Sequence, residues 1–598
     1  MSDDRSFRSS QLISPYGTGA IVDIGDESLM LTDLKGWPRY LEDISLDRLA
    51  RELGVRSLKA PPTAAEFSRS KANKAVESIR FPRWMFCPSC RRMVRWTNSD
   101  ENDNDKPVCT RPTCKQRSFV PMRFVMACEQ GHAEDVPWGW WAHSRGGACD
   151  VKDYHKNLYF KSKPELGSGL DALFVECKAC SGKRDLGDVT SPGAMKSVGV
   201  KCKGNQPWES WGECDQDPVV LQRGASNLYY PIVRSALDIP VAAAMDGESE
   251  LFRAIQSHSS FETFRNLLVD MDNEPAARGV AQMIAADNGC MVEDVFSCVE
   301  NDESEEEFNG ELPTSEELQL AEWEVLVSPD VTNYSSQNFS ARVTTGLEAA
   351  DRWGIAGLVE RIVLLDKLRE VRAFCGFERV KTGVNKVPPA GRHEDIKWLP
   401  AIEVFGEGLF IQLSEYALEN WEKTAGKFID SRVAPLLARF EEGDIAYLPE
   451  PNVRLVALHT FAHLLIRQLS FECGYSSGSI RERIYAAHGQ AGVLIYTADS
   501  DSEGSLGGLV QQGEPERLLP TIAAAIDTAS WCSNDPVCSE METQGVMGLN
   551  KAACHSCTLV SETSCTMNNL MLDRKILLGD ETGDGFFSAV LAAIKGSK

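Results

Sequence analysis

Cysteine is the residue type in this sequence best suited to specific chemistry, and its distribution is uneven. The chain has 19 cysteines in 598 residues, ten of them between Cys87 and Cys214 and five between Cys532 and Cys565. A CxxC pair places two sulfurs on one tight turn, and two such pairs can enclose a tetrahedral zinc ion. In a chain without a secretory leader, this pattern favours metal or thiol chemistry over disulfide bonds.

The first candidate site combines two cysteine pairs that lie close together in the sequence. The pairs belong to one predicted zinc-ribbon structure and comprise Cys87, Cys90, Cys109 and Cys114. A redox-active CxxC would need a thioredoxin-like βαβ context, which the surrounding sequence lacks. The spacing therefore predicts a structural zinc ion.

The second candidate site is less regular and leaves its ligand set open. We predict that it consists of Cys177, Cys180, Cys202 and Cys214. Upstream, the segment CEQGH offers Cys128 and His132 as a further pair, followed by His143 and Cys149, and Cys149 could exchange with a neighbouring site. The alternative for Cys128 and His132 is a buried thiol beside a hydrogen-bonded imidazole.

The C-terminal cysteines predict a third site. Its ligands are expected to be Cys538, Cys554, Cys557 and Cys565, with Cys532 left over. All of these sites are closed by protein side chains, so the expected cofactor is structural Zn²⁺, two to four ions in all, that stabilises folding and takes no part in catalysis.

Motifs for enzymatic chemistry are missing from the sequence. There is no Walker A run, no HExxH helix and no GxSxG elbow. His459 and His463 would share one helix face, but Thr460 stands where a zinc hydrolase has its general base, so we expect packed, hydrogen-bonded histidines. Asp499, Asp501 and Glu503 form an acidic loop after a predicted strand, and such carboxylates can hold a divalent ion.

Basic and aromatic residues alternate beside the first cysteine pair. Arg91, Arg92, Arg95 and Trp96 are candidate nucleic-acid contacts, since guanidinium groups pair with phosphates and indole rings stack on bases. Tryptophan is also the residue with which a metal-rich domain fills a small core. The net charge of −25 argues against a chain that binds DNA unaided.

The elements that must position these residues predict an α+β, multidomain chain with zinc-ribbon insertions, a helical middle region and a C-terminal α/β domain with a cysteine-rich zinc site. Helical spacing is expected in LYYPIVRSALDIP and in GLVERIVLLDKLREVRAFCGF, a strand pair around Gly406–Gly408, and a helix in VRLVALHTFAHLLIRQLSFECG. The predicted domains are an N-terminal α/β segment (1–80), a zinc-ribbon region (81–220), a mainly helical region with an acidic linker (221–335), an α/β region (336–440) and a C-terminal zinc-binding domain (441–598).

Several long phrases resemble one protein family. They are RSSQLISPYGTGAIVDI, RFVMACEQGHAEDVPW, LREVRAFCGFERV, WLPAIEVFGEGLFIQL, LHTFAHLLIRQLSFECGYSSGSIRERIY, IYTADSDSEGSLGGLV and NDPVCSEMETQGVMGLNKAACHSCTLVSETSCTMNNLMLDR. The series resembles the DrmB family of the DISARM anti-phage system, whose C-terminal cysteine domain also occurs in some bacterial repair helicases. The resemblance implies a partner, the superfamily 2 helicase DrmA, and DNA bound mainly through the complex. It also implies zinc ligation by the third site.

The predicted function is that of a non-motor, non-enzymatic subunit that helps a DrmA-like helicase recognise, load or gate foreign DNA. The N-terminal segment MSDDRSFRSSQLISPYG lacks an apolar leader, so we expect a cytoplasmic protein with no membrane association. The alternative is a cryptic metal-dependent nuclease or phosphohydrolase that uses the acidic loop 499–503.

Overall fold

The computed structural model has a mixed α/β fold, as predicted. It describes the chain except for residues 1–7, 39–40, 63–75, 102–106, 147–148, 150–153, 181, 211, 241–254, 256–257, 259, 271–272, 297–314, 394, 444–447, 477, 498–507 and 598. Contacts divide the chain into two compact units. Unit 1 comprises 1–50, 55–235 and 371–403, and unit 2 comprises 51–54, 236–370 and 404–598. The five predicted domain boundaries therefore stay a prediction, whereas the contacts unite segments that are far apart in sequence.

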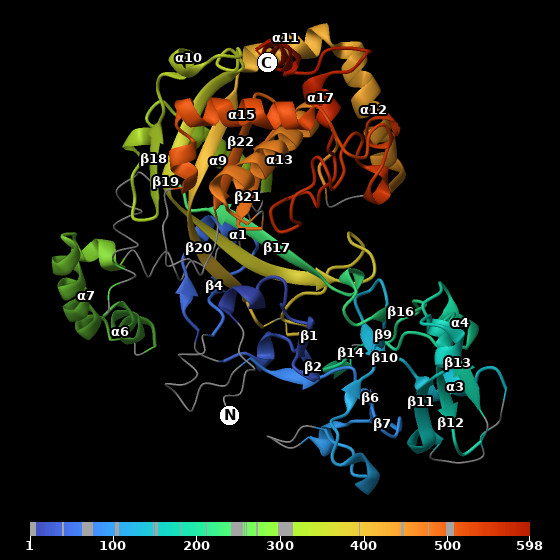
Figure 1. Ribbon diagram of the computed structural model, residues 1–598. Helices are drawn as coiled ribbons and strands as arrows, with labels where there is room; N and C mark the ends of the chain where they lie inside the picture. Colours follow the sequence, from blue (N-terminus) through green and yellow to red (C-terminus); the bar gives the residue numbers. More distant parts are fainter. Residues whose placement is uncertain are drawn as a thin grey trace. The chain divides into compact units, whose positions relative to one another are not determined.

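Unit 1 is built from small antiparallel sheets, labelled in Figure 1. Their orders are β1-β2-β5, β7-β6-β8, β10-β9-β16, β11-β12-β13 and β14-β15. The strands are β1 (Ile21–Ile24), β2 (Glu27–Leu31), β5 (Ser78–Arg80), β6 (Trp84–Phe86), β7 (Met93–Arg95), β8 (Val120–Pro121), β9 (Phe124–Ala127), β10 (Ala133–Asp135), β11 (Leu158–Ser162), β12 (Leu173–Cys177), β13 (Lys183–Asp185), β14 (Asn205–Gln206), β15 (Glu209–Ser210) and β16 (Val219–Gln222).

The helices of unit 1 are short, and its apolar cores are small. They include α3 (Trp138–His143), α4 (Ala194–Ser197) and the 3-10 turn η4 (Pro112–Cys114). Beside β6 and β7, the buried core consists of Met85, Phe119 and three cysteines. Trp84 and Met93 of the same strands enter the larger core around Trp138 and Trp141. A metal bound by the cysteines would add to the stability of the small core.

Unit 2 is organised around a larger sheet. Its strands are β18 (Phe339–Val343), β19 (Val359–Glu378, in unit 2 up to Glu370), β20 (Trp398–Leu413, in unit 2 from Val404), β22 (Gly492–Thr497) and β21 (Ile480–Tyr485). The strands pair in that order, and the pairs β18–β19, β20–β22 and β21–β22 are antiparallel. The prediction of a buried strand over AGVLIYT is confirmed by β22.

Two helix predictions and one hairpin prediction are wrong. GLVERIVLLDKLREVRAFCGF forms the long strand β19, and LYYPIVRSALDIP contains the strand β17 (Tyr230–Leu237). The strand pair expected around Gly406–Gly408 is one continuous strand, β20. Most of β19 is buried on both faces, so its apolar residues run on without the alternation that distinguishes a strand from a helix.

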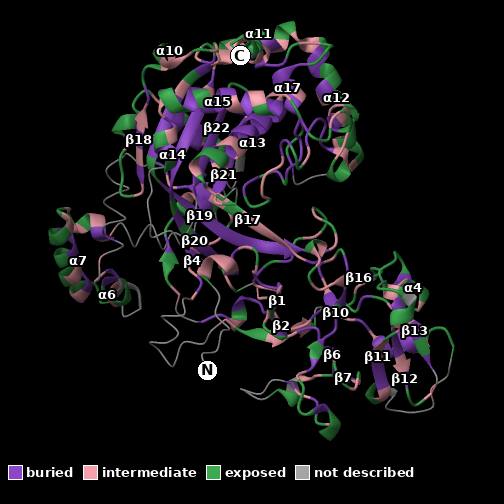
Figure 2. Cartoon of the chain, viewed as in Figure 1, coloured by how far each residue is buried: buried purple, intermediate pink, exposed green. Residues whose placement is uncertain are grey.

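The helix α13 (Val453–Cys473) is the centre of unit 2, and its prediction is confirmed. It contacts β21, β22, α15 (Pro515–Ala529) and α17 (Arg574–Leu578), and both it and α15 are largely buried (Figure 2). Its N-cap is Asn452, whose side chain accepts a hydrogen bond from the Leu455 N–H, and Gly474 ends it with a left-handed φ of 72°. Polar residues in the middle of α13, such as His459 and His463, are therefore fully buried.

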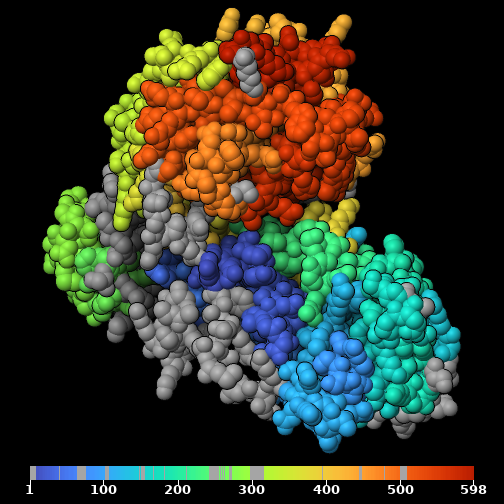
Figure 3. Space-filling view, in the orientation of Figure 1, coloured from blue at the N-terminus to red at the C-terminus, as the bar shows by residue number. Residues whose placement is uncertain are grey.

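Other helices complete unit 2. They are α6 (Phe261–Arg265), α7 (Glu274–Asn288), α9 (Ser315–Val327), α10 (Leu347–Ala350), α11 (Glu415–Thr424), α12 (Gly426–Gly443), α14 (Gly508–Gln512), α16 (Val537–Glu540) and α18 (Ser588–Gly596). On the face shown in Figure 3, the C-terminal part of the chain, orange to red, forms most of the surface of this unit.

Candidate metal centres

The first predicted site is assembled in the structure. Cys87 and Cys90 lie on the turn between β6 and β7, and Cys109 and Cys114 lie before β8. The four sulfurs are within 4.8 Å of one another, and Cys90 Sγ is 3.9 Å from Cys109 Sγ. A tetrahedral ion with Zn–S bonds of about 2.3 Å requires sulfur separations of about 3.8 Å. The group therefore has the dimensions of a four-thiolate zinc site.

Backbone hydrogen bonds prepare this turn for thiolates. The Cys87 N–H donates to the Arg92 carbonyl (2.9 Å), and the Arg91 N–H donates to the Cys87 carbonyl (2.8 Å). Burial alone would raise the pKa of Cys87, but the N–H groups of Cys90 and Ser89 lower it to about 7. Burial raises the pKa of Cys109 to about 12. One sulfur is thus ready to ligate near neutral pH, while a second needs a cation to lose its proton.

The second predicted site is wrong in its grouping. Cys202 and Cys214 join Cys128 and His132, with Cys202 Sγ 3.6 Å from both Cys128 Sγ and His132 Nδ1. Cys128 and His132 flank the tight turn between β9 and β10, where Gly131 has a left-handed φ of 79°. The structure thus places this Cys/His pair together with two further cysteines, Cys202 and Cys214.

Cys177 and Cys180 form a separate group with His143 and Cys149. His143 Nε2 is 3.1 Å from Cys180 Sγ, while His143 Nδ1 is 2.6 Å from the Gly139 carbonyl. An imidazole that donates from Nδ1 keeps the lone pair of Nε2 for a metal. Sequence reasoning missed His143 as a ligand, although its i+4 spacing from Gly139 on a short helix is the signal that favours this bond.

The C-terminal site is also regrouped. Cys532, which was left out, joins Cys538, Cys554 and Cys557, and Cys565 lies elsewhere. The separations between sulfurs are 3.5 Å (Cys532–Cys554), 3.8 Å (Cys538–Cys557) and 3.7 Å (Cys554–Cys557). The cause is local. Helix α15 ends at Ala529, three residues before Cys532, and so its C-terminal end places the Cys532 sulfur beside Cys554.

Arg574 stabilises the segment between Cys532 and Cys538. It is fully buried and binds both carboxylate oxygens of Asp535, at 2.6 and 2.7 Å. Burial would raise the pKa of Cys554, but Asn534 and the surrounding donors lower it to about 6. The segment that carries Cys532 and Cys538 is therefore held against α17 independently of a metal.

Cys565 lies in a different environment, with two histidines of α13 and a carboxylate of β21. His459, His463 and Glu482 have no exposed surface, and Cys565 is nearly buried. Burial would raise the pKa of the Glu482 carboxyl, but the facing imidazoles lower it. The two histidines are packed in the interior as expected, but their hydrogen bonding is incomplete, and the sequence did not predict Cys565 and Glu482 beside them.

The four candidate nucleic-acid contacts lie in different environments of unit 1. The guanidinium of Arg91 lies 5.8 Å from the ring centre of Phe86, and Trp96 packs on Phe119 in the core of the first cysteine group. Arg92 is half-buried, whereas Arg95 is 52% exposed. Of the four, Arg95 is best placed to meet a ligand.

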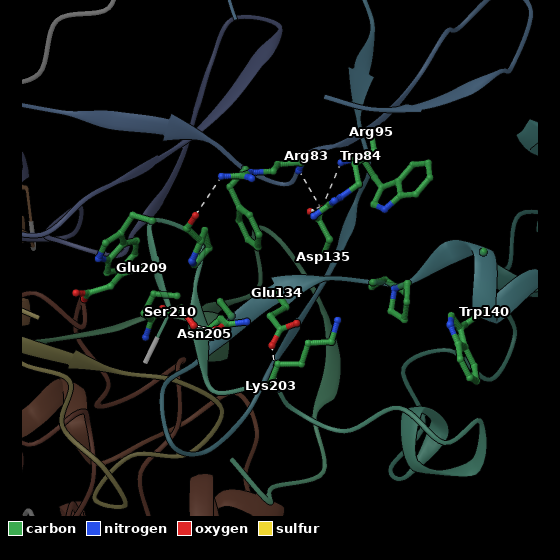
Figure 4. Close-up of a pocket in the computed structure, with 18 of the residues that line it drawn as sticks. Arg83, Trp84, Arg95, Glu134, Asp135, Trp140, Lys203, Asn205, Glu209 and Ser210 are labelled. Carbon is green, nitrogen blue, oxygen red and sulfur yellow. Dashed lines mark hydrogen bonds and ion pairs between the residues drawn. The ribbon is translucent and has the colours of Figure 1, made fainter. Parts of the chain in front are cut away.

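Arg95 lines a cavity of about 620 Å³ in unit 1 (Figure 4). Trp140, which is 59% exposed, and Lys203 line the same cavity. Its floor holds Asp135, which accepts hydrogen bonds from the N–H groups of Arg83 (2.9 Å) and Trp84 (3.3 Å). Burial raises the pKa of Asp135, an effect that Arg95 opposes. Beside the exposed indole, the lining includes three basic side chains and three carboxylates, which are Arg83, Arg95, Lys203, Glu134, Asp135 and Glu209.

Comparison with known proteins first identifies the class of the C-terminal site. A domain of unknown function, DUF8724, matches residues 8–230, and the MrfA Zn-binding domain matches residues 461–558. The group of Cys532, Cys538, Cys554 and Cys557 thus lies in a domain of a zinc-binding class. The Cys/His groups of unit 1 are equally suited to zinc.

The DISARM protein DrmB of Bacillus paralicheniformis is 32% identical over 605 residues, which cover 95% of this chain and 100% of that protein. The chain therefore belongs to the DrmB family. Across the residues that the structure describes, no helix is both long enough and apolar enough to cross a bilayer.

Proposed function

We propose that this chain is a non-motor, cytoplasmic subunit of a DISARM anti-phage complex, and that it binds a DrmA-like superfamily 2 helicase and helps it load or gate foreign DNA. The observation that carries the proposal is the similarity to DrmB over nearly the whole length of both chains. The absence of a Walker A motif and the net charge of −25 also favour a subunit that depends on a partner for motor activity and for most DNA contacts.

Exposed apolar side chains around the C-terminal cysteine group support partner binding. Trp531 is 70% exposed and Val537 is 63% exposed, and each directly precedes a cysteine of that group. Large apolar side chains clustered on a surface commonly mark a protein interface, and tryptophan is enriched among residues that dominate binding energy. The metal would hold these two side chains outward.

Co-expression with a DrmA-like helicase tests the complex. We expect the two chains to co-elute in size-exclusion chromatography and Trp531→Ala to weaken the complex by about 2 kcal/mol or more. The control is Tyr416→Ala, which removes an aromatic ring that is 83% exposed on α11, away from the cysteine group in the chain. Separate elution of the wild-type chains with and without DNA would contradict the proposal.

The cavity in unit 1 is the proposed DNA contact of this subunit. Stacking of a base on Trp140 is worth about 1–3 kcal/mol, and a phosphate contact by Arg95 adds about one unit to the salt dependence of binding. We expect Trp140→Ala to weaken binding of overhang DNA by the complex at all salt concentrations and Arg95→Ala to flatten the salt slope. Arg123→Ala, an exposed arginine bonded to Gln222, is the control. Unchanged binding by both cavity variants would exclude this contact.

The alternative proposal is a metal-dependent nuclease. Its candidate residues Asp499, Asp501 and Glu503 lie outside the described residues. It requires that the isolated chain cut DNA with Mg²⁺ or Mn²⁺ and that Asp501→Ala abolish cleavage while leaving the circular dichroism spectrum unchanged. Uncut DNA in this assay would leave the subunit role as the function to pursue.

A further inference from the structure

Three separate segments of unit 2 bring four metal-binding side chains to one buried point. α13 supplies His459 and His463, one turn apart with ring centres 4.4 Å from each other. β21, which α13 contacts (Figure 1), supplies Glu482, and the loop after the four-cysteine group supplies Cys565. Polar groups this deeply buried require partners, because their desolvation is costly.

The distances between these side chains match the edges of a small coordination polyhedron. His459 Nε2 is 3.2 Å from Cys565 Sγ and 3.1 Å from Glu482 Oε1, and His463 Nε2 is 3.4 Å from the same carboxylate oxygen. Metal bonds of about 2.0 Å to nitrogen or oxygen and about 2.3 Å to sulfur give tetrahedral edges of about 3.3–3.6 Å. One ion can therefore reach all four ligands with little movement.

Hydrogen bonding within the cluster is incomplete without a cation. Among the described residues, His463 Nε2 and Glu482 Oε2 are buried and have no hydrogen-bond partner of good geometry. Buried polar atoms in folded proteins are nearly always satisfied, so each exception calls for an explanation. A metal ion at the centre of the cluster would bind the unsatisfied imidazole nitrogen and the carboxylate.

Surrounding hydrogen bonds orient His463 and Glu482 as ligands. His463 Nδ1 lies 3.2 Å from the Thr558 carbonyl, which leaves Nε2 directed at the cluster. The Thr566 N–H donates to Glu482 Oε1 (3.3 Å). These contacts are the kind that fix the tautomer and the angle of metal-bound side chains.

The sulfur of Cys565 accepts backbone hydrogen bonds, as do sulfurs of the other cysteine groups. It accepts the N–H of Met567, two residues on (3.3 Å), as Cys532 accepts that of Asn534 (3.4 Å) and Cys202 that of Gly204 (3.4 Å). It also accepts the N–H of Asn569 at 3.2 Å. Backbone donors aimed at sulfur stabilise the negative charge of a thiolate.

We propose that His459, His463, Glu482 and Cys565 bind one zinc-class divalent ion, at a second metal site of unit 2. Two neutral imidazoles, a carboxylate and a thiolate carry two negative charges, so a divalent ion makes the buried site neutral. Imidazole and thiolate together select zinc over magnesium or calcium. Four protein ligands and no exposed surface leave no position for water, which makes the site structural.

The new site is linked to the four-cysteine group through one residue. The Thr558 carbonyl faces His463, and the Thr558 hydroxyl donates to Cys557 Sγ at 3.2 Å. The ion would clamp α13 to β21 and to the loop that leaves the four-cysteine group. The inference does not depend on the proposed function.

Metal counting on the full-length chain tests the proposal. We expect Cys565→Ser to contain one zinc fewer than wild type by elemental analysis and native mass spectrometry, Cys538→Ser also one fewer, and the double variant two fewer. Cys473→Ser is the matched control, because this cysteine ends α13 and belongs to none of the five Cys/His groups described above. An unchanged zinc content in folded Cys565→Ser would overturn the proposal.

A second variant covers the case in which Cys565→Ser does not fold. Glu482→Gln keeps the shape of the side chain and removes the charge that a metal site needs. We expect one zinc equivalent to be released to a chelator at least ten-fold faster than from wild type. If the cluster is only a hydrogen-bonded ion pair, Glu482→Gln will leave both the zinc content and the release rates unchanged, and the proposal fails.

Discussion

At the residue scale, His143 tests whether the Cys/His groups of unit 1 bind zinc. His143 Nε2 lies 3.1 Å from Cys180 Sγ and its ring is fixed by Gly139. We expect His143→Ala to weaken zinc retention by its group by more than the 10–100-fold that loss of a supporting residue costs. Competition with a colorimetric chelator measures this. His258→Ala, which removes a contact with Asp287 outside the cysteine groups, should have no effect on zinc.

Residues near each other in sequence were the ones whose partners could be predicted. Cys87, Cys90, Cys109 and Cys114 form one group, and all four lie between residues 87 and 114 of the chain. Cys565 was assigned to the nearest knuckle, but its partners come from a helix about a hundred residues earlier in the chain. The spacing of cysteines along the sequence does not predict a ligand that tertiary packing brings from a distant segment.

At the element scale, the three-stranded sheet β7-β6-β8 should depend on its metal. One of the two cores that its strands enter is little more than Met85, Phe119 and cysteines. We expect Cys87→Ser to cost several kcal/mol in local stability, since structural zinc contributes about 10–16 kcal/mol of binding free energy in small peptides. Hydrogen exchange should show loss of amide protection in this sheet.

The sheet β11-β12-β13 is the internal control for that experiment. It shares the core of Trp138 and Trp141 with Trp84 and Met93 of the first sheet, but it lies beside its own metal group, that of Cys177 and Cys180. Its amides should keep their protection in Cys87→Ser. Equal loss in both sheets would show that the cysteine groups do not act as independent local supports.

Element types were predicted well where the length of the apolar segment is decisive, as for the helix α13 and the short strand β22. The prediction failed for β19, whose buried residues include Arg369, Glu370 and Arg372 among apolar neighbours. These charged side chains are buried although they are polar. Polar residues at intervals in an otherwise apolar segment resemble the spacing of an amphipathic helix. Strand pairing, which decides the matter, is not local in sequence.

At the scale of the whole molecule, the chain combines metal-supported sheets in one unit with a helix-centred α/β core in the other. Unit 2 collects 51–54, 236–370 and 404–598, a grouping that depends on contacts between distant segments and that composition does not reveal. The membership of the DrmB family and the exposed apolar residues beside the last cysteine group together favour a role in an assembly.

The most direct test of this role is the DNA-dependent ATPase activity of a DrmA-like helicase, measured alone and with the full chain over a range of overhang DNA concentrations. The account predicts that the chain raises the activity or lowers the DNA concentration for half-maximal activity, and that Trp531→Ala reduces this effect while Tyr416→Ala does not. If the helicase's ATPase has the same rate and the same DNA dependence with and without the chain, the proposed role as its DNA-loading subunit is contradicted.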